Sequence, residues 1–348
     1  SPEGREIWAV IASAENSFSA EALRQSSLPL VFAHSGIHSG EIDGKDAGMM
    51  LLRDMTVLDR RAELLEGVNF VFVPIFSVDA HERRSSTNRM NQRGPEVQGW
   101  RTNARNLNLN RDYVKAEAVE MRHMLRALQD YDPDLYLDLH VTDGADYQYD
   151  LTYGYNGPHG WSPSISAWLD EHWRPVVDRQ LEDMGHIPGP LIFAVDRFDM
   201  SAGIYDWTAG PRFSTGYGDA RHLPTVLLEN HSLKPYPQRV LGTYVFLAAT
   251  LEVAAAEGAS LRAAIETDRS ARRGEVHLGY RVPQDTPPPT MDFKAVSSET
   301  FISPVTGRPE VRWTGEAYQL ELPIVGNRER TLFVTRPIEY VIPAAWAD

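Results

Sequence analysis

The chain has 348 residues, of which 42% are hydrophobic and 24% are charged, and its formal net charge at pH 7 is −14. This length allows one large domain with a sizeable core, and the composition excludes wholesale disorder. The acidic balance argues against nucleic acid and anionic membrane as partners, and the absence of cysteine excludes disulfides, thiolate nucleophiles and cysteine-ligated metal centres.

The chain opens on Ser-Pro-Glu-Gly-Arg rather than on a methionine and a basic, apolar leader. We interpret this start as a processed or trimmed end. A processed end favours a secreted or periplasmic protein and a trimmed one a cytoplasmic protein, so the compartment stays open. No apolar run approaches the roughly 20 residues of a membrane span, and no span is predicted.

The first two thirds of the chain alternate short apolar runs with amphipathic stretches, which is typical of an α/β sheet covered by helices. The predicted strands are apolar throughout, as strands covered on both faces should be; they are residues 30–34, 69–75, 135–139, 191–195 and 225–229. Apolar residues at steps of three and four predict helices, which are residues 42–54, 114–128 and 238–267.

The pattern changes after residues 268–274, which we interpret as a linker. Beyond them, short strands alternate with proline-rich turns. The sequence therefore predicts an α/β domain over residues 1–270 and a small β-rich segment over residues 271–348.

Two residues three apart, His38 and Glu41, lie between a predicted strand and a predicted helix. Both side chain types are competent zinc ligands. The spacing alone is no more than chance provides, but the carboxyl end of a strand is where open α/β sheets hold their sites.

Two further candidates end later strands. A lone histidine such as His140 is usually a capping or core residue, but with His38 and Glu41 it would complete a catalytic zinc set that leaves a position for water. Glu229 closes an apolar run. It is either the partner of a buried arginine or a general base whose pKa burial raises.

An arginine-rich segment spans residues 83–111, with seven arginines and one glutamate among several asparagines. Its local charge of about +6 opposes the acidic balance of the chain. Such a run is usually a solvated face, but arginine and asparagine also suit the capture of a carboxylate or an oxyanion.

These motifs resemble those of the zinc metallocarboxypeptidases of the carboxypeptidase A type. That family has a His-x-x-Glu pair after a strand, an arginine about ten residues before an Asn-Arg pair, a later zinc histidine and a catalytic glutamate. The corresponding residues here are His38 with Glu41, Arg101, Asn110 with Arg111, His140 and Glu229. The resemblance covers roughly residues 1–265.

The resemblance implies a mixed, largely parallel sheet flanked by helices on both faces, and one Zn²⁺ per chain held by His38, Glu41 and His140. It also implies hydrolysis of the C-terminal peptide bond by a zinc-activated water, with Glu229 as general base. Arg101 would stabilise the oxyanion, and Asn110 with Arg111 would bind the terminal carboxylate of the substrate.

The chain departs from the family pattern in three places. Asn108 replaces an aspartate that supports the first zinc histidine, so it can accept a hydrogen bond but carries no charge. The family's mobile tyrosine aligns with Phe198, so that Tyr205 or Tyr217 substitutes for it or the role is missing. The loop between residues 207 and 229 looks longer, which could reshape the side-chain pocket.

Three acidic residues, Asp143, Asp146 and Asp150, follow His140. They either select a basic residue in the substrate or hydrogen-bond the arginine-rich segment and fix its shape.

Other functions also fit these residues. An N-acyl amino-acid deacylase of the aspartoacylase type would take single acylated amino acids, and an amidase would act on cell-wall peptides. A further alternative is a non-catalytic binding module on the same fold. The chain retains all three ligands together with Glu229, which argues against this alternative. In each enzyme the substrate is a peptide or an acylated amino acid with a free carboxylate; the oligomeric state stays open.

Overall fold

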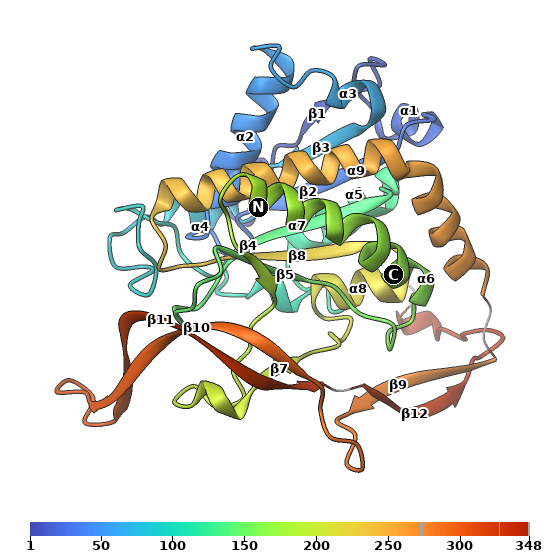
Figure 1. Cartoon of the computed structure of the whole chain (residues 1–348). Coiled ribbons are helices and arrows are strands. Elements are labelled where there is room, and N and C mark those ends of the chain that lie inside the picture. Colours follow the sequence, from blue (N-terminus) through green and yellow to red (C-terminus); the bar gives the residue numbers. More distant parts are fainter. Residues whose placement is uncertain (272–273, 327, 347–348) are drawn as a thin grey trace.

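A seven-stranded sheet forms the centre of the protein in the computed structural model, which describes residues 1–271, 274–326 and 328–346 (Figure 1). In spatial order the strands are β1 (Val10–Ala12), β3 (Asn69–Val73), β2 (Leu30–Ser35), β4 (Leu135–Val141), β8 (Thr225–Asn230), β5 (Leu151–Gly154) and β6 (Pro188–Pro190). Neighbouring strands from β3 to β8 are parallel, whereas β1 is antiparallel to β3 and β5 is antiparallel to β8. The expected mixed, largely parallel sheet is confirmed.

Helices cover both faces of this sheet, as expected. One face carries α2 (Asp43–Thr56), α3 (Leu64–Gly67), α6 (Pro163–Trp168), η2 (Leu169–Trp173), α7 (Arg174–Asp183) and α9 (Tyr236–Ser270). The other carries α1 (Ala20–Gln25), α5 (Val119–Tyr131) and α8 (Ser214–Arg221). Alternate residues of β2 supply the two cores, since Val31 packs in the first and Phe32 in the second.

Four short helical turns are also present among the described residues: α4 (Val78–Glu82), η1 (Leu109–Arg111), η3 (Met200–Ala202) and η4 (Ala344–Trp346). Leu109 of η1 packs in the second core.

Helix α9 contains a longer apolar stretch than the sequence analysis recognised. Among the described residues it is the one helix that is long and apolar enough to cross a membrane, by length and composition alone. However, 67% of its most apolar window is buried inside the protein. Packing against the sheet therefore accounts for its composition.

Four of the five predicted strands are confirmed, as β2, β3, β4 and β8. The prediction of a strand at residues 191–195 is wrong, because this segment forms only a single bridge, between Ala194 and Ile204. Helix α5 begins at Val119 rather than at residue 114, and Val114 is exposed.

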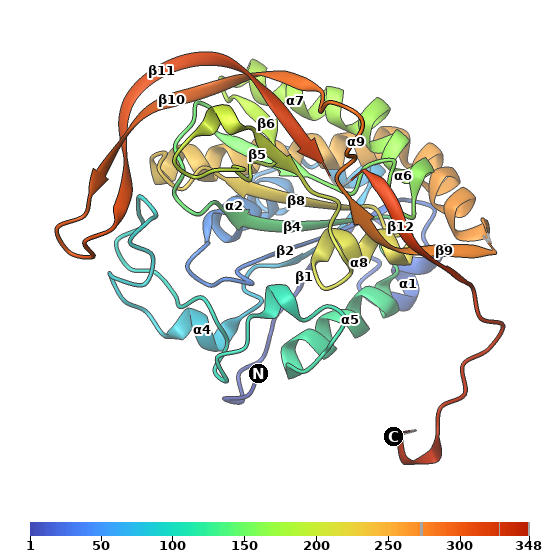
Figure 2. The same ribbon diagram turned by 90° about the horizontal axis from the view of Figure 1, so that it is seen from below.

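The C-terminal segment is β-rich and packs on the rest of the chain. Its strands are β9 (Glu275–Arg281), β10 (Thr290–Ile302), β11 (Pro309–Gly326) and β12 (Glu329–Thr335). β10 and β11 form an antiparallel hairpin, and the end of β11 pairs in parallel with β7 (Ile204–Asp206). Figure 2 shows this hairpin running past the β5–β6 edge of the sheet.

The predicted linker lies partly within α9, which continues to Ser270. Arg272 and Arg273, also part of that prediction, lie outside the described residues. The division into residues 1–270 and 271–348 stays a prediction.

Two glycines allow α2 to lie close to the sheet. A Cβ atom on Gly48 would be 2.3 Å from Cζ of Phe72, and one on Gly44 would be 2.7 Å from Cβ of Leu139. Because Glu41 lies two residues before the start of α2, this close approach also affects where Glu41 lies relative to the ends of the strands.

We expect Gly48→Ala to lower the free energy of unfolding by about 1–3 kcal/mol, because the new methyl group overpacks the Phe72 ring. This loss exceeds the gain in helix propensity of up to about 1 kcal/mol. Chemical denaturation measures the change. Met49→Ala, at an exposed position of the same helix, is the control and should change stability by about 0.5 kcal/mol at most. A G48A protein as stable as the parent would contradict the close packing.

Candidate metal centre and active site

The predicted site residues meet at the carboxyl ends of three parallel strands. His38 and Glu41 lie in the connection between β2 and α2. His140 and Glu229 lie directly opposite each other on the paired strands β4 and β8. The parallel pairing of β2, β4 and β8 brings these side chains to one edge of the sheet.

The three predicted metal ligands form one buried cluster. Their ligand atoms all lie within 4.8 Å of one another. Nδ1 of His38 is 3.1 Å from Oε1 of Glu41, and Nδ1 of His140 is 2.9 Å from Oε2 of the same carboxylate. Two imidazoles and one carboxylate match the donor set of catalytic zinc sites, so these residues fit a zinc ion.

The outer nitrogen of each histidine has its own partner. Nε2 of His38 is 3.2 Å from Oδ1 of Asn108, the residue expected beside it, and Nε2 of His140 is 2.8 Å from Oδ1 of Asp138. Asp138 also contacts Nε2 of His34, at 3.0 Å. These contacts use the Nε2 atoms and leave both Nδ1 atoms facing the cluster.

Glu41 is buried and contacted from several sides. Besides the two histidines, its carboxylate accepts the backbone N–H of Val141 at 3.1 Å and lies 2.7 Å from the guanidinium of Arg89. Burial raises the pKa of Glu41, whereas Arg89 and His38 lower it. The lowering is the larger effect, so the pKa of Glu41 lies well below its ordinary value. This environment favours the carboxylate form of Glu41, which is the form that binds a cation.

Arg89 is a site residue that the sequence analysis did not single out. It is one of seven arginines in residues 83–111, and its side chain is buried. A Cβ atom on Gly40 would lie 2.5 Å from Cγ of Arg89, so this glycine leaves room for the arginine. In the sequence, the only indication of this contact is Gly40, which lies between the two predicted ligands His38 and Glu41.

Glu229 is not neutralised by an arginine. Its Oε2 atom is buried and has no hydrogen-bond partner, and no ion pair to Glu229 is found within the described part of the chain. Burial raises its pKa to about 8, although His140 opposes this shift. This environment favours the interpretation of Glu229 as a general base over a structural ion pair.

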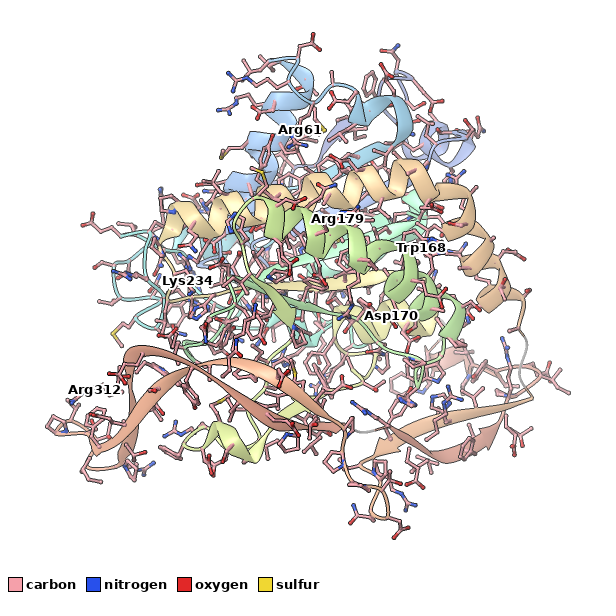
Figure 3. All side chains as sticks on the ribbon, viewed as in Figure 1. Arg61, Trp168, Asp170, Arg179, Lys234 and Arg312 are labelled. Atoms are coloured by element: carbon pink, nitrogen blue, oxygen red, sulfur yellow. The ribbon has the colours of Figure 1, made fainter. Side chains whose placement is uncertain are left out.

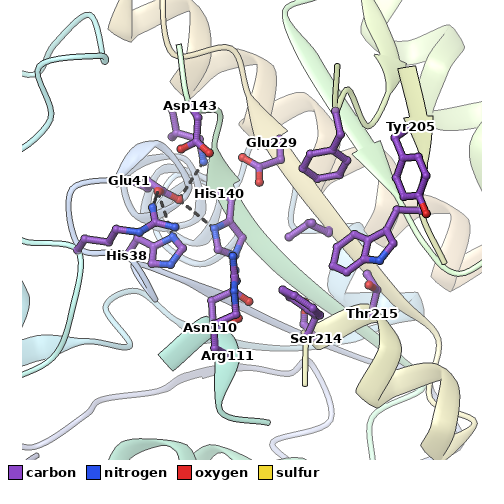
Figure 4. Close-up of a pocket in the computed structure, with 16 residues that line it drawn as sticks. His38, Glu41, Asn110, Arg111, His140, Asp143, Tyr205, Ser214, Thr215 and Glu229 are labelled. Atoms are coloured by element: carbon purple, nitrogen blue, oxygen red, sulfur yellow. Dashed lines mark hydrogen bonds and ion pairs between the residues drawn. The ribbon is translucent and has the colours of Figure 1, made fainter. Parts of the chain in front are cut away.

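All the predicted site residues line one cavity of about 340 Å³ (Figure 4). On one side it is lined by the metal ligands, Glu229, Arg101, Asn110 and Arg111. On the other side it is lined by aromatic side chains and the beginning of α8: Phe193, Tyr205, Trp207, Phe213, Ser214 and Thr215. The sequence analysis expected residues 207–229 to shape the pocket, and four of these six residues lie there.

Positive charge concentrates on one wall of this cavity. The guanidinium of Arg111 lies 4.5 Å from the centre of the Phe213 ring, and its Nη1 donates to the carbonyl of Asn110 at 2.7 Å. Burial lowers the pKa of Arg111, and the nearby cations Arg101 and Arg212 lower it further. Three cations close together favour the binding of an anion between them.

The acidic residues after His140 have separate partners. Asp146 lies 3.0 Å from Nε2 of His231, and Asp150 accepts from Gln238 at 2.7 Å. The interpretation that they hydrogen-bond the arginine-rich segment is wrong for these two residues, because their partners are His231, directly after β8, and Gln238 of α9. Asp143 lines the cavity.

The candidates for the mobile tyrosine lie in different places. Tyr205 lines the cavity, across from the metal ligands in Figure 4. Tyr217 packs against Tyr113, with ring centres 5.6 Å apart, and Phe198 lies exposed beneath the guanidinium of Arg197. Of the three, Tyr205 is the one beside the predicted site.

Residues 1–162 match the sequence model of the zinc carboxypeptidase family. No curated protein matches the chain. Among solved structures, a metallo-carboxypeptidase from Pseudomonas aeruginosa, in complex with (2-guanidinoethylmercapto)succinic acid, shares 16% sequence identity and a TM-score of 0.53, over 75% of this chain and 63% of that one. A metallo-carboxypeptidase from Burkholderia cenocepacia shares 14% identity and a TM-score of 0.51, over 72% of this chain and 62% of that one.

The resemblance to the zinc metallocarboxypeptidases is therefore confirmed, by the family's sequence pattern over residues 1–162 and by the shared fold. At the level of the family, these matches support a zinc metallopeptidase. The chain spans less than two thirds of the length of the two solved structures.

We expect Asp138→Asn to weaken zinc binding by about 10–100-fold, because the substitution removes the anion that orients His140 and raises its basicity. Competition with a chromophoric chelator measures the affinity. Asp146→Asn is the matched control, because it changes a carboxylate that contacts a histidine outside the cluster, and it should bind zinc like the parent. Equal zinc affinity in D138N and the parent would remove this role from Asp138.

Proposed function

We propose that this protein is a zinc-dependent metallocarboxypeptidase that hydrolyses the C-terminal peptide bond of peptides. The observation that carries the proposal is a shared cavity. A buried zinc-type ligand set, an unpaired glutamate and a wall of arginines all line the same space of about 340 Å³. This combination suits an amide that lies next to a free carboxylate.

Zinc held by His38, Glu41 and His140 would supply a Lewis acid that polarises a carbonyl and lowers the pKa of water. Glu229 accepts a proton from the attacking water and then donates it to the leaving amine. A cation beside Glu229 would lower its pKa from about 8, which increases the fraction of the base form at neutral pH.

The arginines of the cavity wall stabilise the two negative charges of the reaction, the oxyanion and the terminal carboxylate. Arg101 lies next to the cluster, with Nη1 3.7 Å from Oε1 of Glu41, and donates to the oxyanion that develops on the scissile carbonyl. Arg111 and Asn110 bind the terminal carboxylate, for which the planar guanidinium offers two parallel N–H donors. The aromatic wall receives the C-terminal side chain.

A single acylated amino acid carries the same carboxylate and amide, so the deacylase is the alternative within the hydrolases. Substrate length separates the two functions: a deacylase ignores peptides, whereas a carboxypeptidase releases their last residue.

We expect the purified chain to contain about one zinc ion and to release C-terminal residues from a peptide library until a chelator is added. Glu229→Gln should keep its zinc while kcat falls by at least about 100-fold, because the general base is lost. Metal analysis and product analysis by mass spectrometry measure both.

Glu171→Gln, at an exposed position, is the control and should keep full activity. A parent chain without zinc when purified without chelator, or turnover retained in E229Q, would contradict the proposal.

We expect Arg111→Ala to raise KM for peptides with a free C-terminus by about 10–100-fold, because a charge-assisted contact to the carboxylate is lost. Peptides with an amidated C-terminus should be hydrolysed slowly and equally by both proteins. Arg105→Ala, an exposed arginine of the same segment, should leave both substrates unchanged. Equal effects of R111A on free and amidated peptides would argue against carboxylate binding.

A further inference from the structure

A second cavity, of about 510 Å³, adjoins the one that contains the metal ligands. Three residues, Asp143, Phe193 and Glu229, line both cavities. A molecule whose reacting bond lies beside Glu229 can therefore extend into both spaces. In Figure 4, Asp143 and Glu229 lie on the other side of His140 from Asn110 and Arg111.

The C-terminal hairpin forms the outer wall of this second cavity. Glu310, Val311 and Trp313 of β11 line it, across from Thr142, Tyr147 and other residues of the α/β part. Residues 191–194 complete the wall. Their apolar character, which suggested a strand in the sequence analysis, is explained by this position.

The hairpin is held firmly against the rest of the protein. Nε2 of Gln148 donates to the carbonyls of Ala295 and Tyr318, each at 2.8 Å. Phe293 and Leu322 are fully buried in an apolar cluster that also contains Tyr147 and Tyr149. The outer wall is thus in place before any ligand arrives, which reduces the entropic cost of binding.

Strand alternation directs two apolar side chains of β11 inward. Arg312 projects away from the body of the protein (Figure 3) and lies over the Phe301 ring, at 4.7 Å. Its neighbours Val311 and Trp313 point to the opposite face, where they line the cavity.

The chemistry of the second cavity differs from that of the first. Half of its lining residues are apolar: Ala145, Leu191, Ile192, Phe193, Ala194, Met200, Val311 and Trp313. Three carboxylates also line it: Asp143, Glu229 and Glu310. Its one lining cation, within the described residues, is Arg197, which pairs with Glu310 at 3.6 Å. The first cavity, with Arg101 and Arg111, suits a carboxylate. In the second cavity the carboxylates outnumber the one cation, so an anion is disfavoured there, and the apolar wall formed by residues 191–194, Val311 and Trp313 suits an apolar group.

We propose that the second cavity binds the part of the substrate on the amino side of the scissile bond, and that the wall formed by Val311 and Trp313 selects an apolar or aromatic side chain there. This inference rests on the proposed function, because it takes the peptide's terminal carboxylate to lie at Arg111. The C-terminal hairpin is then a specificity element of the enzyme.

Two blocked dipeptides test this inference. They share the C-terminal residue that the parent protein releases best, and the residue before the scissile bond is phenylalanine in one and glycine in the other. We expect the parent to show a kcat/KM at least about tenfold higher for the phenylalanine peptide, as burial of an aromatic side chain predicts. Trp313→Ala should reduce this preference by about tenfold and leave the glycine peptide within twofold.

Tyr318→Ala is the matched control, because Tyr318 is an exposed aromatic residue of the same strand that lines neither cavity. It should leave both peptides unchanged. Val311→Ala should reduce the preference in the same direction as W313A and serves as a second variant if W313A folds poorly. Equilibrium binding of both peptides to the zinc-loaded Glu229→Gln protein should show the same preference without turnover.

The outcomes separate the two proposals. Hydrolysis of neither dipeptide by the zinc-loaded parent overturns the proposed function, and this inference with it. Hydrolysis of both, with no preference for phenylalanine or with a preference that W313A and V311A keep, overturns only the role of the hairpin.

Discussion

The buried carboxylate of Glu41 is the group on which the rest of the site depends. A buried charge is costly unless it is paired and hydrogen-bonded, and Glu41 is contacted by His38, His140, Arg89 and the backbone of Val141. These partners come from the loop after β2, from β4 and from the arginine-rich segment. The Glu41 carboxylate thus contacts three separate parts of the chain at the carboxyl edge of the sheet. A bound cation would replace its contacts with the two histidines.

Charge and apolar surface divide the site into two regions. The chain carries a net charge of −14, yet Arg101, Arg111 and Arg212 lie close together beside the first cavity. The net negative charge of the whole chain therefore does not exclude the binding of an anion at this site. Half of the residues that line the second cavity are apolar, and its lining arginine is paired. A peptide with a free carboxylate at one end and an apolar side chain further along matches both regions.

The proposed chemistry and the proposed selectivity of the site depend on different parts of the fold. The predicted metal ligands and Glu229 lie at or after the ends of central strands, which are buried on both faces. The walls of both cavities come instead from residues 191–215 and from the hairpin β10–β11. Loops and edge elements can change without disturbing the sheet, which explains how a shared fold can accommodate a different preference for substrate.

The sequence by itself determined the central strands, the two-sided helical cover, the His38, Glu41 and His140 set and the position of Glu229. Each of these leaves a local pattern: a continuous apolar run, a period of three to four, or a polar residue at the end of a strand. Only the tertiary structure decided that Arg89 contacts Glu41 and that Asp138 contacts His34. It also decided that Asp146 contacts His231 and Asp150 contacts Gln238, and that residues 191–194 line a cavity. Such contacts join residues far apart in the chain, and an apolar run reads the same in a strand as in a cavity wall, so only the packing of the whole chain distinguishes them.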